Sequence, residues 1–260
     1  MDVKKTKKLS GQTATTTVAA TEKFVKVDAA DKVTLIDLQN LKAAIFGGLD
    51  LDCMMDNVFI MYHNRYENYP LMVKPDKWMA LQSSGEIADG VVVVEGGKAL
   101  VVAPTDTGGA GIAWSSAAVN GGAVTTDDRV AAMADWNGKA NTASIIAKSA
   151  ASAVTNTGAY APGFCNLYSR TNANGKGLTA GKWWLPSAGE MMMIYAHMVK
   201  INYCLGLISG ASQLLETRYW TSTEFDPSLA WVLRLTDGSL TGVTKIAGKY
   251  AVRPVSAFIE

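Results

Sequence analysis

Histidine and cysteine are the side chains that most often perform acid–base, nucleophilic or metal chemistry near neutral pH, and this chain has few of them. His63 and His197 stand far apart, at no spacing that favours a metal pair. Cys53, Cys165 and Cys204 are an odd number at wide intervals, which predicts neither a disulfide framework nor a zinc site. We therefore expect histidines with structural roles and buried free thiols.

The carboxylates do not form a catalytic pair either. Glu190 stands three residues after Ser187, the spacing of a capping box at a helix start, and Glu224 is interpreted as a brace for a turn. Asp135–Asn141 carries oxygen ligands that would suit calcium, but Asp, Asn and Gly also build ordinary turns, which we favour. With no P-loop, G-x-S-x-G, HExxH or CxxC motif, we expect no catalytic residue, no cofactor and no metal, and hence no enzyme.

The composition excludes two classes of partner. The 260 residues carry a net charge of +1, with 48% hydrophobic and 18% charged residues, so electrostatics gives no basis for binding nucleic acid or an anionic membrane. No apolar run is long enough for a membrane span, and no apolar stretch follows the basic start as in a secretory signal. We expect no nucleic-acid partner, no membrane insertion, and assembly in a reducing cytoplasm.

Residues 1–48 are expected to form a small unit of one strand and one helix. Phe24–Asp28 has the pattern of a short strand, and Thr34 is expected to be a strand end. Three apolar residues at i, i+3 and i+7 then share one face of a helix that Gly47 and Gly48 end: Leu38, Leu41 and Ile45. Because so small a unit buries little core, the helix needs a partner, either the rest of the chain or copies of itself.

Residues 49–260 give clear signals for some elements and none for others. The Tyr-, Met- and Asn-rich stretch that follows Leu49 has no clean period. A hairpin is well marked, because the apolar runs Val91–Val94 and Ala99–Ala103 flank the turn Glu95–Lys98. Residues 105–126 are rich in Gly, Ser and Thr and are expected to be loops.

Two helices and several strands are expected in the rest of this region. One helix runs from Asn141, with an inner side formed by Ile145, Ile146 and Ser149. The other is capped by Ser187 and continues an apolar face over roughly three turns: Met191, Ile194, Tyr195, Met198 and Tyr203. AWVLRL alternates as a strand, TDG marks a turn, and YAVRPV is expected to be a last strand that Pro254 ends.

Two parts of the chain resemble known families. The stretch KKLSGQTATTTVAATEKFVKVDAADKVTLIDLQNLKAAI is similar to the N-terminal segment of many phage tail and tail-fibre proteins. KWWLPSAGE, YWTSTE, AWVLRL and YAVRPV, in that order, resemble the C-type-lectin-like fold. Two groups use this fold with such motifs: the formylglycine-generating-enzyme-like family and the variable proteins diversified by retroelements, in which DWNGKANTASIIA is also a common phrase.

The departures from these families favour a binding protein. Formylglycine-generating enzymes need a reactive cysteine pair near the C-terminus, and no cysteine follows Cys204; the Glu-Pro-Asn and Gln-Pro-Asp triplets of calcium lectins do not occur either. The resemblance implies an α+β fold, with a C-type-lectin-like domain of mixed small sheets and two helices over residues 49–260, preceded by the strand–helix unit 1–48. An enzyme of the formylglycine-generating-like superfamily or a cell-surface adhesin that is not diversified is the alternative.

In the retroelement-diversified family, a C-terminal segment keeps its scaffold positions and varies its solvent-facing ones, which corresponds here to about residues 212–255. The positions that match the scaffold are Tyr219, Trp220, Ser222, Thr223, Glu224, Trp231, Leu233, Leu235, Gly238, Val252, Arg253 and Pro254. The positions that fall where the family varies, and that the resemblance marks as ligand-binding, are Arg218, Phe225, Asp226, Ser228, Leu229, Val232, Arg234, Thr236, Ser239, Thr241, Val243, Thr244, Ile246, Ala247 and Lys249.

Strand alternation agrees with this division. One face of AWVLRLT is expected to hold the core: Trp231, Leu233 and Leu235. The other is expected to meet solvent: Val232, Arg234 and Thr236. A surface that mixes an aromatic residue, Arg, aliphatic and small polar residues suits the binding of a protein or a glycan. An ordinary solvated face is the alternative.

Together, the resemblances imply a phage tail-fibre receptor-binding protein that binds a bacterial surface protein or glycan without catalysis. Residues 1–48 would join it to other phage tail proteins. Tail fibres are commonly trimers, so a homotrimer is expected, with Leu38, Leu41 and Ile45 in its contact, and avidity would strengthen weak single sites. The protein would be assembled in the host cytoplasm and would function in the virion, as part of the phage tail.

Overall fold

The computed structural model describes residues 23–27, 33–37, 57–66, 69–149 and 157–258. The first two ranges form an antiparallel pair, β1 (Lys23–Val27) and β2 (Val33–Asp37), in which Val27 lies opposite Val33. The expected strand at residue 24 is confirmed, but the prediction that Thr34 ends a strand is wrong. β2 continues to Asp37 because the β-branched residues of VTLID favour an extended chain. The expected helical residues Leu38, Leu41 and Ile45 lie outside the described residues.

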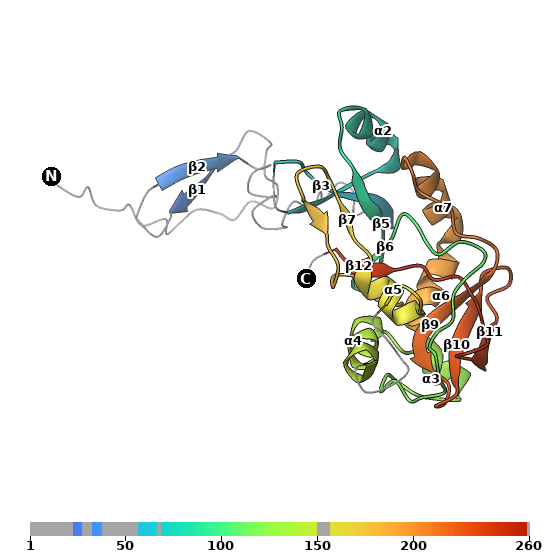
Figure 1. The fold of residues 1–260 in the computed structure, drawn as a ribbon. Helices are drawn as coiled ribbons and strands as arrows, with labels where there is room; N and C mark the ends of the chain where they lie inside the picture. Colours follow the sequence, from blue (N-terminus) through green and yellow to red (C-terminus); the bar gives the residue numbers. More distant parts are fainter. Residues whose placement is uncertain (1–22, 28–32, 38–56, 67–68, 150–156, 259–260) are drawn as a thin grey trace.

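A five-stranded antiparallel sheet lies at one end of the region formed by the described residues from 57 to 258 (Figure 1). Its order is β12 (Val255–Ala257), β6 (Lys98–Val102), β5 (Ala88–Glu95), β3 (Val58–His63) and β4 (Pro70–Val73). The last strand of the chain therefore pairs with the β5–β6 hairpin. The expected hairpin is confirmed, with Glu95 opposite Lys98 and positive φ angles at Gly96 and Gly97, as a tight two-residue turn needs.

A three-stranded antiparallel sheet forms the other end, with β10 (Leu229–Arg234) between β9 (Arg218–Glu224) and β11 (Leu240–Thr244). The last predicted strand, YAVRPV, is wrong in its bounds. Tyr250 and Ala251 make isolated bridges, and β12 begins only after Pro254, which has no N–H for a ladder bond. A two-residue pair, β7 (Arg170–Thr171) and β8 (Gly177–Leu178), completes the strands.

Six helices surround these sheets in the described part of the chain, where two were predicted. They are α2 (Pro75–Ser83), α3 (Arg129–Met133), α4 (Gly138–Ser149), α5 (Ala161–Leu167), α6 (Ala188–Ala196) and α7 (Met198–Leu207). Most of them are too short to produce a recognisable helical period in the sequence. The α+β class is confirmed. Within the described residues, no helix is both long and apolar enough to span a membrane.

The capped helix is confirmed at its start and differs at its end. Ser187 and Glu190 form the predicted capping box, with the Glu190 carboxylate accepting from the Ser187 backbone N–H at 2.9 Å. The helix breaks at His197, whose φ of −109° and ψ of 11° are not helical. The break shifts the phase of α7 relative to α6. Tyr203, expected on the buried face, is therefore 61% exposed, and Ile201 and Cys204 face the core instead.

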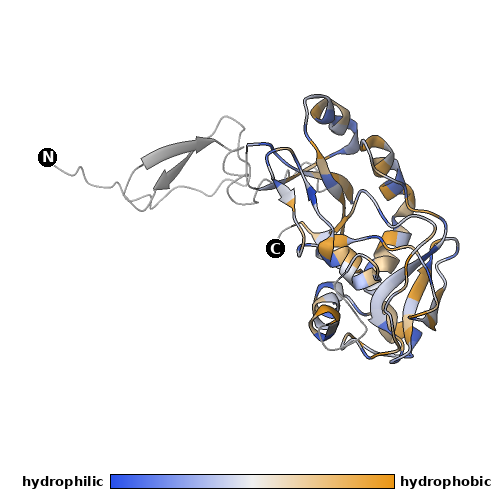
Figure 2. Cartoon of the chain, in the orientation of Figure 1, coloured by the Kyte–Doolittle hydropathy of each residue, from blue (hydrophilic) through white to orange (hydrophobic). Residues whose placement is uncertain are grey.

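The core consists of three clusters that use both faces of both main sheets. Ile60 of β3 packs with Trp231 and Leu233 of β10 in the largest cluster, together with α6 and α7. Phe59 of β3 points to the other side of the five-stranded sheet, into a second cluster. A third cluster includes Val232 of β10 and lies beneath α4 and α5. Figure 2 shows hydrophobic and hydrophilic residues side by side along the helices of this region, α2 included.

Candidate functional site

The positions expected to form the scaffold are the buried ones. From Tyr219 to Glu224, every residue of β9 is buried, although four of the six are polar or charged. Trp231, Leu233 and Leu235 are buried in the largest core cluster, as predicted. Val252, Arg253 and Pro254 are also buried, and Gly238 is half-buried against the ring of Tyr195.

The positions expected to bind a ligand are, with one exception, exposed or half-buried along β9, β10, β11 and the turns that join and follow them. The exposed ones are Arg218, Ser228, Thr236, Thr241, Thr244, Ile246, Ala247 and Lys249. The half-buried ones are Phe225, Asp226, Leu229, Arg234, Ser239 and Val243. We refer to these fourteen residues together as the β9–β11 surface. Ligand binding by these residues stays a prediction.

Val232 is the exception, and its predicted exposure is wrong. Its side chain is 0% exposed and packs in the third core cluster with Trp114, Trp220 and Val252. The prediction assumed that only one face of the strand holds the core. β10 is instead the central strand of its sheet and has core on both faces. Alternation cannot distinguish a solvent face from a second core when the residue is apolar.

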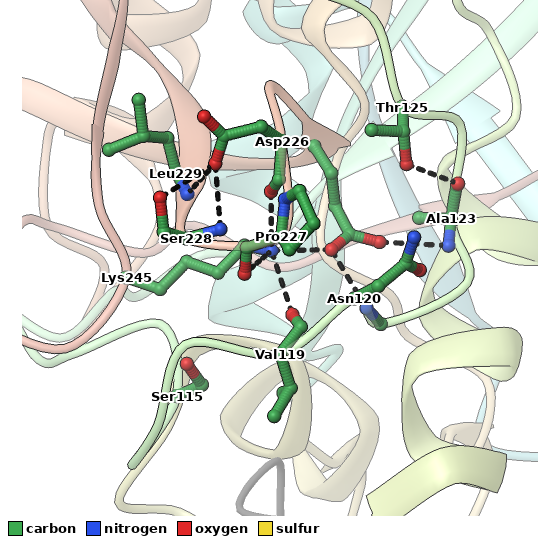
Figure 3. Close-up of polar contacts among 12 residues, drawn as sticks. Ser115, Val119, Asn120, Ala123, Thr125, Asp226, Pro227, Ser228, Leu229 and Lys245 are labelled. Atoms are coloured by element: carbon green, nitrogen blue, oxygen red, sulfur yellow. Dashed lines mark hydrogen bonds and ion pairs between the residues drawn. The ribbon is translucent and has the colours of Figure 1, made fainter.

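A fully buried ion pair lies directly beneath this surface. Nζ of Lys245 lies 2.5 Å from Oε2 of Glu224, and both side chains are 0% exposed. The ammonium also donates to the carbonyl oxygens of Val119, Asp226 and Pro227 at 2.9, 3.0 and 3.0 Å, as Figure 3 shows. Burial lowers the pKa of Lys245, and the hydrogen bond and charge of Glu224 oppose that change.

This ion pair holds together three segments that are distant in the sequence. Glu224 accepts from the backbone N–H groups of Gly121 and Ala123 at 2.8 and 3.0 Å. The Lys245 ammonium lies 4.7 Å from the centre of the Trp114 ring. The loop over residues 114–126 is thereby fixed to the turn after β9 and the turn after β11 (Figure 3). The role predicted for Glu224, a turn brace, is confirmed. Its partner was missed, because lysine is seldom buried and its neighbours in the sequence are exposed.

A second buried ion pair fixes the ends of the candidate segment. Nη2 of Arg253 lies 2.8 Å from Oδ2 of Asp106 and donates to the carbonyl oxygens of Ser212 and Gln213. The Tyr219 hydroxyl donates to the same Asp106 oxygen at 3.0 Å, and burial raises the pKa of Tyr219 to about 12. The beginning and the end of the segment therefore meet at one guanidinium group.

Some polar residues of the β9–β11 surface are already engaged in turns. Oδ1 of Asp226 accepts from the backbone N–H groups of Ser228 and Leu229, both at 2.7 Å. Arg234 donates to Asp237, whose pKa is lowered by that hydrogen bond. These side chains shape the surface, whereas Thr241, Thr244 and Ile246 leave their side chains in solvent. A ligand would contact exposed side chains carried by turns that these hydrogen bonds hold in place.

The groups considered first for chemistry have structural partners. His63 Nδ1 lies 2.7 Å from Asp89 Oδ2, and His197 Nδ1 lies 3.0 Å from the Met193 carbonyl oxygen. Cys165 and Cys204 are buried free thiols, as predicted, and burial raises the pKa of Cys204 to about 12; Cys53 lies outside the described residues.

The favoured interpretation of Asp135–Asn141 as a turn agrees with its contacts. Asp135 Oδ1 accepts from the backbone of Asn137, and its Oδ2 accepts from Asn141 and from Thr223 of β9. Across the described ranges, no three His, Cys, Asp or Glu side chains form a group that could hold a metal ion.

By its described elements, the chain is an α+β protein of small antiparallel sheets and short helices. No protein-family model matches it, and no curated protein matches it. A solved structure, a fimbrial protein from Bacteroides ovatus ATCC 8483, is similar with a TM-score of 0.39 and 16% sequence identity. The match covers 61% of this chain and 35% of that protein, so the chain spans about a third of its length.

Proposed function

We propose that this protein is an adhesin that binds a bacterial surface protein or glycan through the β9–β11 surface, without catalysis. In its specific form, the proposal is a phage tail-fibre receptor-binding protein with a C-type-lectin-like domain over residues 49–260 and a surface diversified by a retroelement. Residues 1–48 would attach it to other tail proteins in the virion, and three copies would act together.

One observation carries the proposal: the separation between buried and exposed positions within residues 218–255. The residues expected from the family resemblance to be constant are buried, apart from the half-buried Gly238, and those expected to vary are exposed or half-buried, apart from Val232. Exposed substitutions usually change the free energy of unfolding by no more than about 0.5 kcal/mol. A surface of this kind can therefore change its residues while the fold stays the same.

The buried ion pairs support the same proposal. Glu224–Lys245 and Asp106–Arg253 fix the turns and the segment ends through side chains that are almost fully buried. The backbone position of Thr241, Thr244 or Ile246 is thus set by contacts that none of these side chains makes. Modest affinity at each copy is sufficient when several copies bind one cell, because effective concentration raises avidity.

The binding experiment compares matched variants of the full chain. Fluorescently labelled protein is mixed with intact cells of a panel of gut anaerobes, and bound fluorescence is measured by flow cytometry. Ile246→Asp, 48% exposed on this surface, should reduce binding at least about tenfold. Val199→Asp, 81% exposed on α7, is the control and should bind as the wild type does. Equal binding by Ile246→Asp and wild type would argue against this surface.

The finer parts of the proposal have separate tests. A near-copy of the codons for residues 212–255 that differs only at adenines, next to a reverse-transcriptase gene, is expected if the surface is diversified; its absence would leave a plain adhesin. Light scattering should give the mass of three chains, and a mass equal to one chain would contradict the trimer. Neither result affects the binding test.

A further inference from the structure

A groove of about 620 Å³, open to solvent, is formed between α6, the turn of the β5–β6 hairpin and the side chain of Trp136. α6 packs against strands of both main sheets (Figure 1), and Trp136 stands in the short connection between α3 and α4. The volume lies within the range for small-ligand sites, about 300 to 1,000 Å³. None of the lining residues belongs to the β9–β11 surface.

The middle of the groove is apolar. Met192, Met193 and Ala196 of α6 line it, and Ala196 is exposed. Trp136 is 36% exposed, whereas every other tryptophan of the chain is at most 6% exposed, so this ring is not part of the core. Thioether and indole groups pack well against aliphatic and aromatic side chains. The middle of a ligand in this groove should therefore be apolar.

The groove follows α6 from its first turn to its end. The Gly189 N–H donates to the Asp135 carbonyl at 3.0 Å, and an added Cβ on Gly189 would lie 3.1 Å from Cε2 of Trp136. Glycine at this position thus lets the indole ring lie against the start of the helix. His197 ends the helix at the other side. From position 189 to position 197 the helix rises about 12 Å, which sets the length of the groove.

Two opposite charges of the hairpin lie apart instead of pairing. Glu95 and Lys98 stand opposite each other across the turn, where opposite charges attract. No ion pair of the described residues joins them: Nζ of Lys98 lies 5.5 Å from the centre of the Trp136 ring, and Oε2 of Glu95 lies 3.5 Å from Nδ1 of His197. That nitrogen is already 3.0 Å from the Met193 carbonyl oxygen, and the Glu95 side chain is 56% exposed. A cation therefore stands near the start of α6, and an anion near its end.

The turn also offers main-chain groups to a ligand. Because Gly96 has no side chain, it lines the groove with main-chain atoms alone. It is exposed, and neither its N–H nor its C=O makes a hydrogen bond with another described residue. Unpaired amide groups of this kind bind the amide groups of an extended peptide in many recognition sites.

These features exclude simpler ligands. An anionic lipid would meet Glu95 at one end of the groove, and an alkylamine would meet Lys98 at the other. A neutral sugar would use neither charge, and the Lys98 ammonium already lies over the indole ring on which a sugar would stack. The remaining class carries an anion and a cation at its two ends, an apolar middle and amide groups between them.

We propose that this groove binds a short extended peptide with apolar residues in its middle, a cationic group at Glu95 and an anionic group at Lys98. An extended chain rises about 3.3 Å per residue, so four residues span about 13 Å and match the length of the groove. The amino end would lie at Glu95 and the carboxyl end at Lys98. The site is distinct from the β9–β11 surface and does not depend on the proposed adhesion.

The test is a titration by saturation-transfer NMR on the full chain. The main probe is the peptide Ala-Leu-Leu-Ala with both termini free, at up to about 10 mM, a concentration that detects millimolar affinity. Four comparison ligands each remove one feature. The N-acetylated peptide lacks the cation, the C-amidated peptide lacks the anion, Ala-Ser-Ser-Ala lacks the apolar middle, and 8-aminooctanoate lacks the amide groups.

Three variants test the groove itself. Lys98→Met keeps an unbranched side chain without its charge, and Glu95→Gln keeps the shape of the carboxylate without its charge. Lys249→Met and Glu216→Gln are their matched controls, since both residues are exposed and neither lines the groove. Ala196→Trp fills the middle of the groove from an exposed helical position.

The wild type and both controls should bind Ala-Leu-Leu-Ala equally, and each comparison ligand at least about threefold more weakly. Lys98→Met should bind the free and the C-amidated peptide equally, and Glu95→Gln should bind the free and the N-acetylated peptide equally. Ala196→Trp should abolish binding. Circular dichroism must show that each variant is folded; if one charge variant is not, the other decides with Ala196→Trp.

Four results would overturn the proposal. They are no binding of Ala-Leu-Leu-Ala to the wild type, wild-type affinity in Ala196→Trp, a wild-type preference for the free peptide in a folded charge variant, and equally tight binding of Ala-Ser-Ser-Ala or 8-aminooctanoate. The last would assign the groove to a ligand other than an apolar peptide.

A peptide blocked at both ends separates two sources of the ligand. Acetyl-Lys-Leu-Leu-Glu-amide carries the same two charges on side chains. If it binds as tightly as Ala-Leu-Leu-Ala, a segment within a partner protein fits the groove; if it does not bind, the groove takes a free peptide. A failure of the adhesion experiment with Ile246→Asp would leave this result unchanged, since the two sites share no residue.

Discussion

Replacing Lys245 by methionine tests whether the buried ion pair supports the β9–β11 surface. The substitution keeps an unbranched side chain of similar length but removes the ammonium group. Glu224 would remain 0% exposed, with only the backbone N–H groups of Gly121 and Ala123 to stabilise its charge. Three carbonyl oxygens, of Val119, Asp226 and Pro227, would lose a donor at the same time.

The expected loss in the free energy of unfolding is about 3 to 5 kcal/mol, the usual cost of removing one partner of a buried ion pair. Domains typically have about 5 to 15 kcal/mol in total, so Lys245→Met should be visibly less stable and could lose its fold at moderate temperature. Urea unfolding followed by tryptophan fluorescence measures the difference, and the slope of the transition shows whether it remains two-state. Lys249→Met, an exposed lysine four residues later, is the matched control and should change stability by less than about 0.5 kcal/mol.

A double variant distinguishes loss of the pair from loss of packing. Glu224→Gln with Lys245→Met removes both charges, so no uncompensated carboxylate is buried and part of the stability should return. If Lys245→Met costs less than about 1 kcal/mol, or if the double variant is less stable than the single one by the full cost of Glu224→Gln, the reasoning about this ion pair is refuted.

Two further predictions concern residues outside this pair. Burial raises the pKa of Glu190 from 4.5 to about 7. Between these two pH values the folded state keeps a proton that the unfolded state releases. The contribution of the protonated Glu190 to the free energy of unfolding is therefore complete below pH 4.5 and is lost as the pH rises to about 7. Relative to Glu190→Gln, the free energy of unfolding of the wild type, measured with urea, should therefore fall by roughly 3 kcal/mol between pH 4.5 and 7. A difference between the two proteins that does not change with pH would contradict this. In the same assay, Val232→Ala should lower the free energy of unfolding by about 2 kcal/mol, and Thr244→Ala should lower it by less than about 0.5 kcal/mol. Equal losses in the two variants would show that Val232 is not a core residue.

Elements with a strong local signal could be predicted from the sequence. The hairpin around Gly96 and Gly97 and the capping box at Ser187 each depend on residues within a few positions, and both were found. β3 was missed because all its residues from Val58 to Tyr62 are buried, so neither a helical nor a strand period could appear. The short helix α5 likewise gives too few turns for a pattern.

The candidate site was predictable where side-chain type follows exposure, and not elsewhere. Polar residues such as Thr241 and Thr244 are exposed, as expected. Val232 was predicted wrongly, because it is an apolar residue that fills a second core, and Lys245 was missed, because it is a charged residue whose burial depends on Glu224. Both depend on what lies on the far side of the sheet, namely α4, α5 and the loop over residues 114–126, which sequence spacing within a strand does not specify.

The contact of Arg253 with the Ser212 and Gln213 carbonyls has a practical consequence for protein engineering. A segment whose first residues are bonded to a residue near its end behaves as a closed loop, and lengthening such a loop costs little additional entropy. Residues 212–255 can thus be regarded as a unit whose two ends are already held together. Exchanged between related chains that keep Asp106 and the core residues on which β9 and β10 pack, it should carry its exposed residues without new linkers being designed.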